Sequence, residues 1–169
     1  MGNYHARFLG GNGTARLLTY PVFTNKNITM IQVIALDLEG TLVSNAMSQI
    51  PRPGLFDFLE GCKSICDRVV IFTTVREELF RKVARLLVDE RIAPEWFRDV
   101  EYIHWEGKTK DLSFIPGVTP SESLLVDDFY IYVHPGQEGQ WVEIKQFDHP
   151  YPDTDRELGI TLSVLQSKM

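Results

Sequence analysis

The chain carries, at residues 33–42, the stretch Val33-Ile34-Ala35-Leu36-Asp37-Leu38-Glu39-Gly40-Thr41-Leu42. Its leading apolar residues form an unbroken run, which is typical of a buried strand in a parallel sheet. An acid at the end of such a strand lies at the carboxyl edge of the sheet, where open α/β folds bind their ligands. Asp37 and Glu39 are two positions apart, so on an extended chain their side chains point to the same side. Gly40 then allows a tight turn and the close approach of a substrate.

Taken alone, these two acids are most simply interpreted as a solvated turn after a strand. Two further apolar strands change that interpretation, because they also end in polar residues. Residues 68–72 run into Thr73, and residues 123–126 run into Asp127. In a doubly wound sheet the ends of such strands converge on one crevice, although they are far apart in the sequence. The sequence therefore predicts a site suited to a metal and a phosphate at Asp37, Thr73 and Asp127.

The rest of the chain alternates apolar runs with amphipathic segments. We expect further short strands at 100–105 and 141–144, and helices at 53–67, 77–90 and 155–167. This alternation predicts right-handed crossovers and a parallel sheet of the α/β class. The residues expected to face the core are Leu55, Phe58, Leu59, Cys62 and Cys66 on the first helix, Leu79, Val83, Leu86 and Leu87 on the second, and Leu158, Leu162 and Leu165 on the third.

Composition is ordinary for a globular protein. The 169 residues are 44% hydrophobic and 24% charged, which fits one domain with a sizeable core. A net charge of −6 argues against non-specific nucleic-acid binding. No stretch approaches the ~20 apolar residues of a membrane span, and no secretory signal is expected. Cys62 and Cys66 are interpreted as small core residues rather than a redox pair, so a cytoplasmic location is the default.

Residues 1–30 differ in character from the rest of the chain. They contain the turn cluster Gly10-Gly11-Asn12-Gly13 and a possible strand at 15–23 that Pro21 interrupts. An added hairpin, a flexible leader and translated sequence upstream of a start at Met30 are all compatible with this pattern. We expect no chemistry in this N-terminal extension.

Three further motifs lie downstream of the first. They are Pro51-Arg52-Pro53-Gly54-Leu55 with Phe58-Leu59, then Lys110-Asp111-Leu112-Ser113, and then Leu124-Leu125-Val126-Asp127-Asp128. With residues 33–42, they resemble the hhhhDxDGT, RPG-x-x-x-FL, KDLS and hhhDD motifs (h is apolar) of the haloacid dehalogenase (HAD) superfamily. The resemblance is to the NIF-like branch, which includes phosphatases acting on the C-terminal domain of RNA polymerase II. It implies a phosphatase domain over 31–169, a HAD-like Rossmannoid three-layer sandwich with a central parallel sheet and no large cap domain.

The resemblance also implies roles for the acids. Asp37 corresponds to the nucleophile, which forms an aspartyl-phosphate and so divides a slow hydrolysis into two steps. Asp127 corresponds to a ligand of Mg²⁺, together with Asp37 and the backbone carbonyl of Glu39, because hard oxygen donors suit that ion. Asp128 is expected next to the metal ligands, touching the ion at most through water. A plain N-cap is the alternative role for Asp128.

The resemblance implies that a hydroxyl group and a cation bind the phosphate. Thr73 corresponds to the Ser or Thr that donates to phosphate oxygens, with Thr74 as a competing candidate one residue later. Lys110 corresponds to the lysine that holds the phosphate, whereas Lys108 is interpreted as a surface residue. The scattered histidines show no metal-ligand spacing, so no zinc site is expected.

Glu39 departs from the family pattern, which has a second Asp at this position. That acid protonates the leaving oxygen and then activates water, a role worth about 10²–10⁴-fold in rate. Glutamate is longer by one methylene, about 1.5 Å. Three interpretations are open: a site shaped to suit Glu39, a slow enzyme, or a module that binds phosphate groups without turnover.

The short connections predict an open site. Residues 38–52 and 74–109 are too short for a full cap domain, so a phosphoprotein or another bulky phosphorylated substrate would have access. A small phosphate ester is the alternative substrate.

The aromatic residues of the second segment, 74–109, are expected either to pack in the core or to form a rim that grips a peptide. They are Trp96, Phe97, Tyr102 and Trp105. Arg76 is a further candidate for contact with a phosphate or an acidic neighbour.

Overall fold

The computed structural model describes residues 30–169, so the expected extension at 1–30 lies almost entirely outside the described residues. The strands are β1 (Val33–Leu36), β2 (Arg68–Ile71), β3 (Glu101–Tyr102), β4 (Ser123–Asp127) and β5 (Trp141–Glu143). The α-helices are α1 (Leu55–Ile65), α2 (Glu77–Asp89) and α3 (Glu157–Lys168). Short 3₁₀ turns occur at Glu95–Asp99, Leu112–Phe114, Pro120–Glu122, Tyr130–Tyr132 and Glu138–Gln140.

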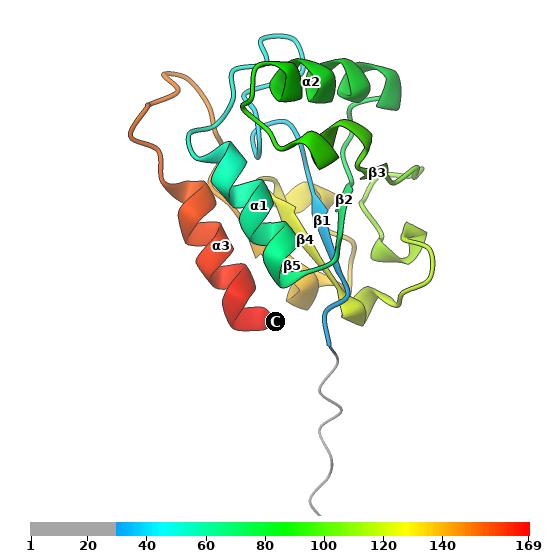
Figure 1. Cartoon of the computed structure of the whole chain (residues 1–169). Helices are drawn as coiled ribbons and strands as arrows, with labels where there is room; N and C mark the ends of the chain where they lie inside the picture. The colour runs from blue at the N-terminus through cyan, green and yellow to red at the C-terminus, as the bar shows by residue number, and fades with distance from the viewer. Residues whose placement is uncertain (1–29) are drawn as a thin grey trace, which may run out of the picture.

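The strands form one parallel sheet in the order β3-β2-β1-β4-β5 (Figure 1). β1 is central, and its Leu36 pairs with Ile71 of β2 on one side and with Val126 of β4 on the other. The carboxyl ends of β1, β2 and β4 therefore lie at the same level along one edge of the sheet. This arrangement confirms the α/β class and the convergence of three strand ends that the sequence predicts.

The three central strands β1, β2 and β4 contribute alternate residues to two apolar layers, as the two-residue period of a strand requires. Ile34 and Leu36 of β1 belong to the cluster that also contains the buried residues of α1, α2 and α3. Val33 and Ala35 face the other way, against the segment 103–118. That segment holds a 3₁₀ turn instead of an α-helix, whereas α1 and α3 run side by side over the first face (Figure 1).

The connections contain no cap domain, as expected. The segment between β1 and α1 is a loop, and the segment between β2 and β4 holds α2, short 3₁₀ turns and β3. No helix within residues 30–169 combines the length and the apolar character needed to cross a membrane.

Two details of the helices differ from expectation. α1 begins at Leu55 and not at Pro53, because Gly54 adopts a φ of 82° that does not belong to a right-handed helix. On α2, Leu86 is exposed and the expectation that it faces the core is wrong. The buried stripe is centred on Phe80 and Val83, because the Phe80 ring packs edge-on against Phe97 with centroids 5.8 Å apart. The cysteines are confirmed as core residues, since both are buried and free.

Candidate active site

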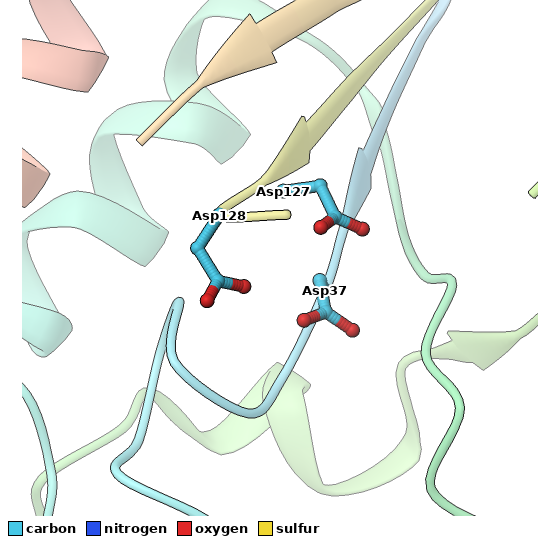
Figure 2. A group of neighbouring side chains, drawn as sticks. All are labelled: Asp37, Asp127 and Asp128. Atoms are coloured by element: carbon cyan, nitrogen blue, oxygen red, sulfur yellow. The ribbon is translucent and has the colours of Figure 1, made fainter. Parts of the chain in front are cut away.

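Three aspartates meet at the carboxyl edge of the sheet. Asp37 follows β1, Asp127 ends β4 and Asp128 comes next, and Figure 2 shows the three carboxylates facing one small space. One oxygen from each lies within 4.8 Å of the others. The sheet register produces this meeting, because the Asp37 N–H donates to the carbonyl of Val126 at 3.0 Å and so holds Asp37 beside Asp127.

Lys110 joins two of these acids. Its Nζ donates to Asp37 Oδ1 at 2.7 Å and to Asp127 Oδ2 at 2.5 Å, and its side chain is almost completely buried. The lysine reaches this position because its backbone N–H donates to the carbonyl of Tyr132, in the segment after β4. Burial would lower the pKa of Lys110, but the charges of Asp37 and Asp127 outweigh burial and raise the pKa. The ammonium therefore stays charged at neutral pH.

The three carboxylates carry more negative charge than one ammonium balances. Burial, and then the charge of Asp37, raise the pKa of Asp127 to about 6, against the opposing effect of Lys110. Burial and the charges of Asp37 and Asp127 raise the pKa of Asp128 to about 6 as well. A divalent cation would relieve this repulsion, and a set of carboxylate oxygens suits Mg²⁺. The residues present therefore fit the metal that the sequence predicts.

Gly40 allows the loop after β1 to approach Asp128. Its φ is 73°, in the left-handed region, and a Cβ at this position would lie 2.3 Å from Asp128 Oδ2. Any larger residue would therefore displace the carboxylate. On the same loop, Thr41 Oγ1 donates to Asp128 Oδ1 at 3.4 Å.

Glu39 lines the same cavity as Asp37 and Asp128. This cavity has a volume of about 370 Å³. Glu39 Oε1 accepts a hydrogen bond from the Ala46 N–H at 2.6 Å, which fixes the half-buried side chain against the following loop. The carboxylate of Glu39 is outside the group of three aspartates that come together as possible metal ligands in residues 30–169.

The two threonines after β2 occupy different environments. Thr73 is buried, and its hydroxyl accepts a hydrogen bond from the Val75 N–H at 3.3 Å. Thr74 is exposed and lines the cavity that contains Asp37. Both threonines line a second cavity next to the first. Of the two threonines, Thr74 is the one that lines the cavity of Asp37.

Arg52 holds the loop after β1 in place through hydrogen bonds, a role that the sequence does not indicate. Its buried guanidinium donates to both carboxylate oxygens of Asp155, at 2.9 and 3.1 Å. It also donates to the carbonyls of Gly40 and Thr41, each at 3.2 Å, and to that of Lys145 at 2.7 Å. The loop after β1 is thereby tied to the chain that leads into α3. The motif around residues 51–55 marks Arg52, but nothing near it in the sequence indicates the partner 103 residues away.

The aromatic residues expected in the core or in a rim all pack against the core, and two of them also line a cavity. Phe97 is fully buried and Trp96 packs against the same core. Tyr102 and Trp105 are half-buried and line the second cavity. Arg76 and Lys108, both exposed, line it as well.

Comparison with known proteins agrees with this geometry. The sequence profile described as NLI interacting factor-like phosphatase matches residues 32–169, nearly the whole chain. Comparison with curated proteins finds no match. The family match confirms the NIF-like, HAD-type resemblance indicated by the four motifs. Because the profile spans well over half of the sequence, the chain belongs to the NLI interacting factor-like phosphatases.

Proposed function

We propose that this chain is a Mg²⁺-dependent phosphomonoester hydrolase that acts through an aspartyl-phosphate on Asp37. The observation that carries the proposal is the buried ammonium of Lys110, shared between Asp37 and Asp127 at the sheet edge. A fixed positive charge beside a carboxylate nucleophile suits the transfer of a negatively charged phosphoryl group. The family match supports phosphatase activity in general, and the cluster of three aspartates supports a metal.

Asp37 and Asp127, with the backbone carbonyl of Glu39, are the proposed metal ligands, and Asp128 lies close enough to assist directly or through water. When bound, Mg²⁺ supplies positive charge that screens the repulsion between the carboxylates and the phosphate. Thr73, Thr74 and Lys110 are the proposed donors to the phosphate oxygens. The exposed position of Thr74 in the cavity makes its hydroxyl the more accessible of the two.

In the proposed first step, a carboxylate oxygen of Asp37 attacks phosphorus, and the bond to the leaving oxygen breaks. The protonated Glu39 gives its proton to that oxygen. In the second step, Glu39 takes a proton from water, the hydroxide attacks phosphorus, and Asp37 is released with inorganic phosphate. Since Glu39 Oε1 accepts from Ala46, Oε2 is the oxygen available for the proton.

The test is hydrolysis of an aryl phosphate by the purified protein, with Mg²⁺ and with a chelator. We expect turnover that requires Mg²⁺ and falls to background in Asp37→Asn, while circular dichroism shows an unchanged fold. Comparable turnover with the chelator, or activity that survives in Asp37→Asn, would refute the mechanism. The open site favours phosphoproteins and other bulky substrates, so phosphopeptides are expected to exceed small phosphate esters in kcat/KM.

A second candidate is a phosphate- or phosphoprotein-binding module with weak or no turnover. The tether of Glu39 to Ala46 favours it, because a proton carrier misplaced by about 1 Å can cost about 10²-fold in rate. Glu39→Asp separates the two functions. Activity that appears only in this variant would identify the natural chain as a binder, whereas loss of activity in Glu39→Asp would show a site shaped for Glu.

A further inference from the structure

A second, larger cavity adjoins the one that contains Asp37. It has a volume of about 490 Å³ and is formed by the loop after β2 and the segment after β3. The two cavities share Thr74 and Tyr132 in their walls. A substrate whose phosphate lies at Asp37 would therefore extend its remaining part into this second cavity.

The walls of the second cavity are held in place before any ligand arrives. The Tyr102 hydroxyl donates to the carbonyl of Val75 at 2.6 Å, and Trp105 Nε1 donates to that of Thr73 at 2.8 Å. The Trp105 ring also packs edge-on against the buried Phe72, with centroids 5.8 Å apart. Such a preformed wall avoids the entropy cost of ordering a loop on binding.

The charge of the second cavity is opposite to that of the whole chain. Arg76 and Lys108 line it, and neither forms an ion pair with any carboxylate in the part of the chain that the structure describes. Glu106 is the one acid among its lining residues. His104 also lines the wall, and its Nε2 lies 3.1 Å from Oε2 of Glu77. A chain of net charge −6 thus presents two cations beside the candidate site.

We propose that the second cavity is a substrate subsite, in which Arg76 and Lys108 bind another anionic group of the phosphorylated substrate. The group is a carboxylate or a second phosphate, and a phosphopeptide with acidic side chains beside the phosphorylated residue carries it. This inference rests on the proposed function, because it places the reacting phosphate at Asp37. Guanidinium and ammonium groups recognise these anions through charge-assisted hydrogen bonds.

The test compares three matched phosphopeptides, which have glutamine, glutamate or a second phosphoserine at the positions flanking the phosphorylated residue. Exposed charge pairs contribute modestly, so we expect about a 5- to 10-fold preference in kcat/KM for the anionic peptides at low salt. The preference should shrink as salt is added. In the double variant Arg76→Ala/Lys108→Ala, the preference for the anionic peptides should disappear. The relative rates of the glutamate and phosphoserine peptides identify which anion the subsite prefers.

The matched control is Lys82→Ala/Arg85→Ala, which removes two exposed positive charges from α2, outside the cavity. This variant should keep both the turnover and the preference of the natural chain. Equal use of all three peptides by the natural chain would overturn the subsite while leaving the phosphatase intact. A preference that survives in the Arg76/Lys108 variant, or one that the control loses as well, would also overturn it.

Binding of the same peptides to Asp37→Asn protein, measured by fluorescence anisotropy, tests the subsite without turnover. We expect tighter binding of the anionic peptides, and loss of that difference when Arg76 and Lys108 are also replaced. No hydrolysis of any phosphate would refute the proposed function. Equal binding of neutral and anionic peptides would refute the subsite, so the two failures are distinguishable.

Discussion

At the scale of single residues, the site is defined by an imbalance of charge. Three carboxylates from Asp37, Asp127 and Asp128 come together, and only Lys110 lies among them as a cation within residues 30–169. Lys110 donates to Asp37 and to Asp127. Asp128 instead accepts a hydrogen bond from the Thr41 hydroxyl. Such an arrangement costs stability without a cation and gains stability with one, so metal binding and folding are coupled.

Asp128→Asn tests this coupling. Without metal, we expect the variant to be more stable than the natural chain at pH 7, because the pKa of about 6 means that ionisation of Asp128 is disfavoured in the folded state. The sign follows from the raised pKa: the folded protein binds the proton more tightly, so this acid lowers stability as pH rises from about 4 to above 6. At a Mg²⁺ concentration of 100 times Kd, the natural chain should gain about 2.7 kcal/mol and the variant much less. Urea unfolding with chelator and with Mg²⁺ measures the stability without metal and the gain from metal in each protein. An equal gain in stability from Mg²⁺ in the two proteins would contradict the prediction.

Gly40→Ala tests the close approach of the loop to Asp128. A Cβ in the left-handed region costs about 1–2 kcal/mol, and here it would also push against the Asp128 carboxylate. We expect lower stability in urea and loss of Mg²⁺-dependent turnover. Gly159→Ala is the matched control, because a Cβ on this residue of α3 meets open space and should stabilise the helix by about 0.5–1 kcal/mol. Normal Mg²⁺ binding and turnover in Gly40→Ala would contradict the role of this glycine.

At the scale of elements, the loop between β1 and α1 depends on contacts made far along the chain. Arg52 links the carbonyls of Gly40 and Thr41 to the carboxylate of Asp155, just before α3. Its guanidinium also lies over the ring of Phe147, 5.2 Å from the centroid. The segment that leads into α3 therefore supports the loop that carries the candidate proton carrier, although it contributes no residue to the aspartate cluster.

Arg52→Ala should destabilise the fold by about 3–5 kcal/mol, because it leaves a mostly buried carboxylate and several carbonyls without their donor. Urea unfolding at pH 7 measures this change. We also expect reduced turnover at temperatures where the variant is still folded, since Gly40 and Thr41 lose their anchor. A change within about 1 kcal/mol, the size of an ordinary surface substitution, would show that the network does not support the loop.

The same pair predicts a pH dependence. Burial would raise the pKa of Asp155, but hydrogen bonds from Arg52 and from the Glu157 N–H outweigh burial and lower the pKa. A lowered pKa contributes stability that is present above the ordinary value of about 4 and is lost as pH falls through the folded value. Asp155→Asn should therefore have a lower free energy of unfolding than the natural chain at pH 7. This difference in stability, measured by urea unfolding, should shrink as the pH falls below 4. Asp148→Asn, a change at an exposed acid, is the control and should leave the pH profile unchanged.

At the scale of the whole molecule, one sheet separates two apolar layers of unequal construction. The helices cover one face, and the segment 103–118 covers the other with little regular structure. That second segment supplies Lys110 to the aspartates, and Trp105 to the wall of the second cavity. The face without helices is therefore the one that carries much of the candidate site.

The thiols report on the integrity of the helical layer. Burial, with the nearby Cys66, raises the pKa of Cys62 to about 12, and burial also raises the pKa of Cys66. Because the thiolate is the reactive form, Cys62 should react with a disulfide reagent at pH 8 at least about 10²-fold more slowly in the native protein than in urea, and Cys66 should also react more slowly. Cys62→Ser assigns the remaining signal to Cys66. Rapid labelling of Cys62 in the native protein would show that this layer opens without global unfolding.

Local sequence was enough to predict the strands, the parallel sheet and the meeting of Asp37 with Asp127. These features follow from apolar runs and from the rule that parallel strands end at one edge, so they can be inferred without knowing the contacts. The motif resemblance likewise identified Lys110 and the family. The buried stripe of α2 was only partly predictable, because the packing of Phe80 on Phe97 decides which side of the helix faces inward.

Contacts between residues distant in the chain were set by the tertiary structure alone. The bond from Arg52 to Asp155 and the cavity lined by Arg76 and Lys108 both fall in this class. Neither leaves a local pattern, because side-chain contacts across many residues depend on the path of the loops. The sequence thus specifies the chemistry at the sheet edge, while the tertiary structure specifies the support and the surroundings of that chemistry.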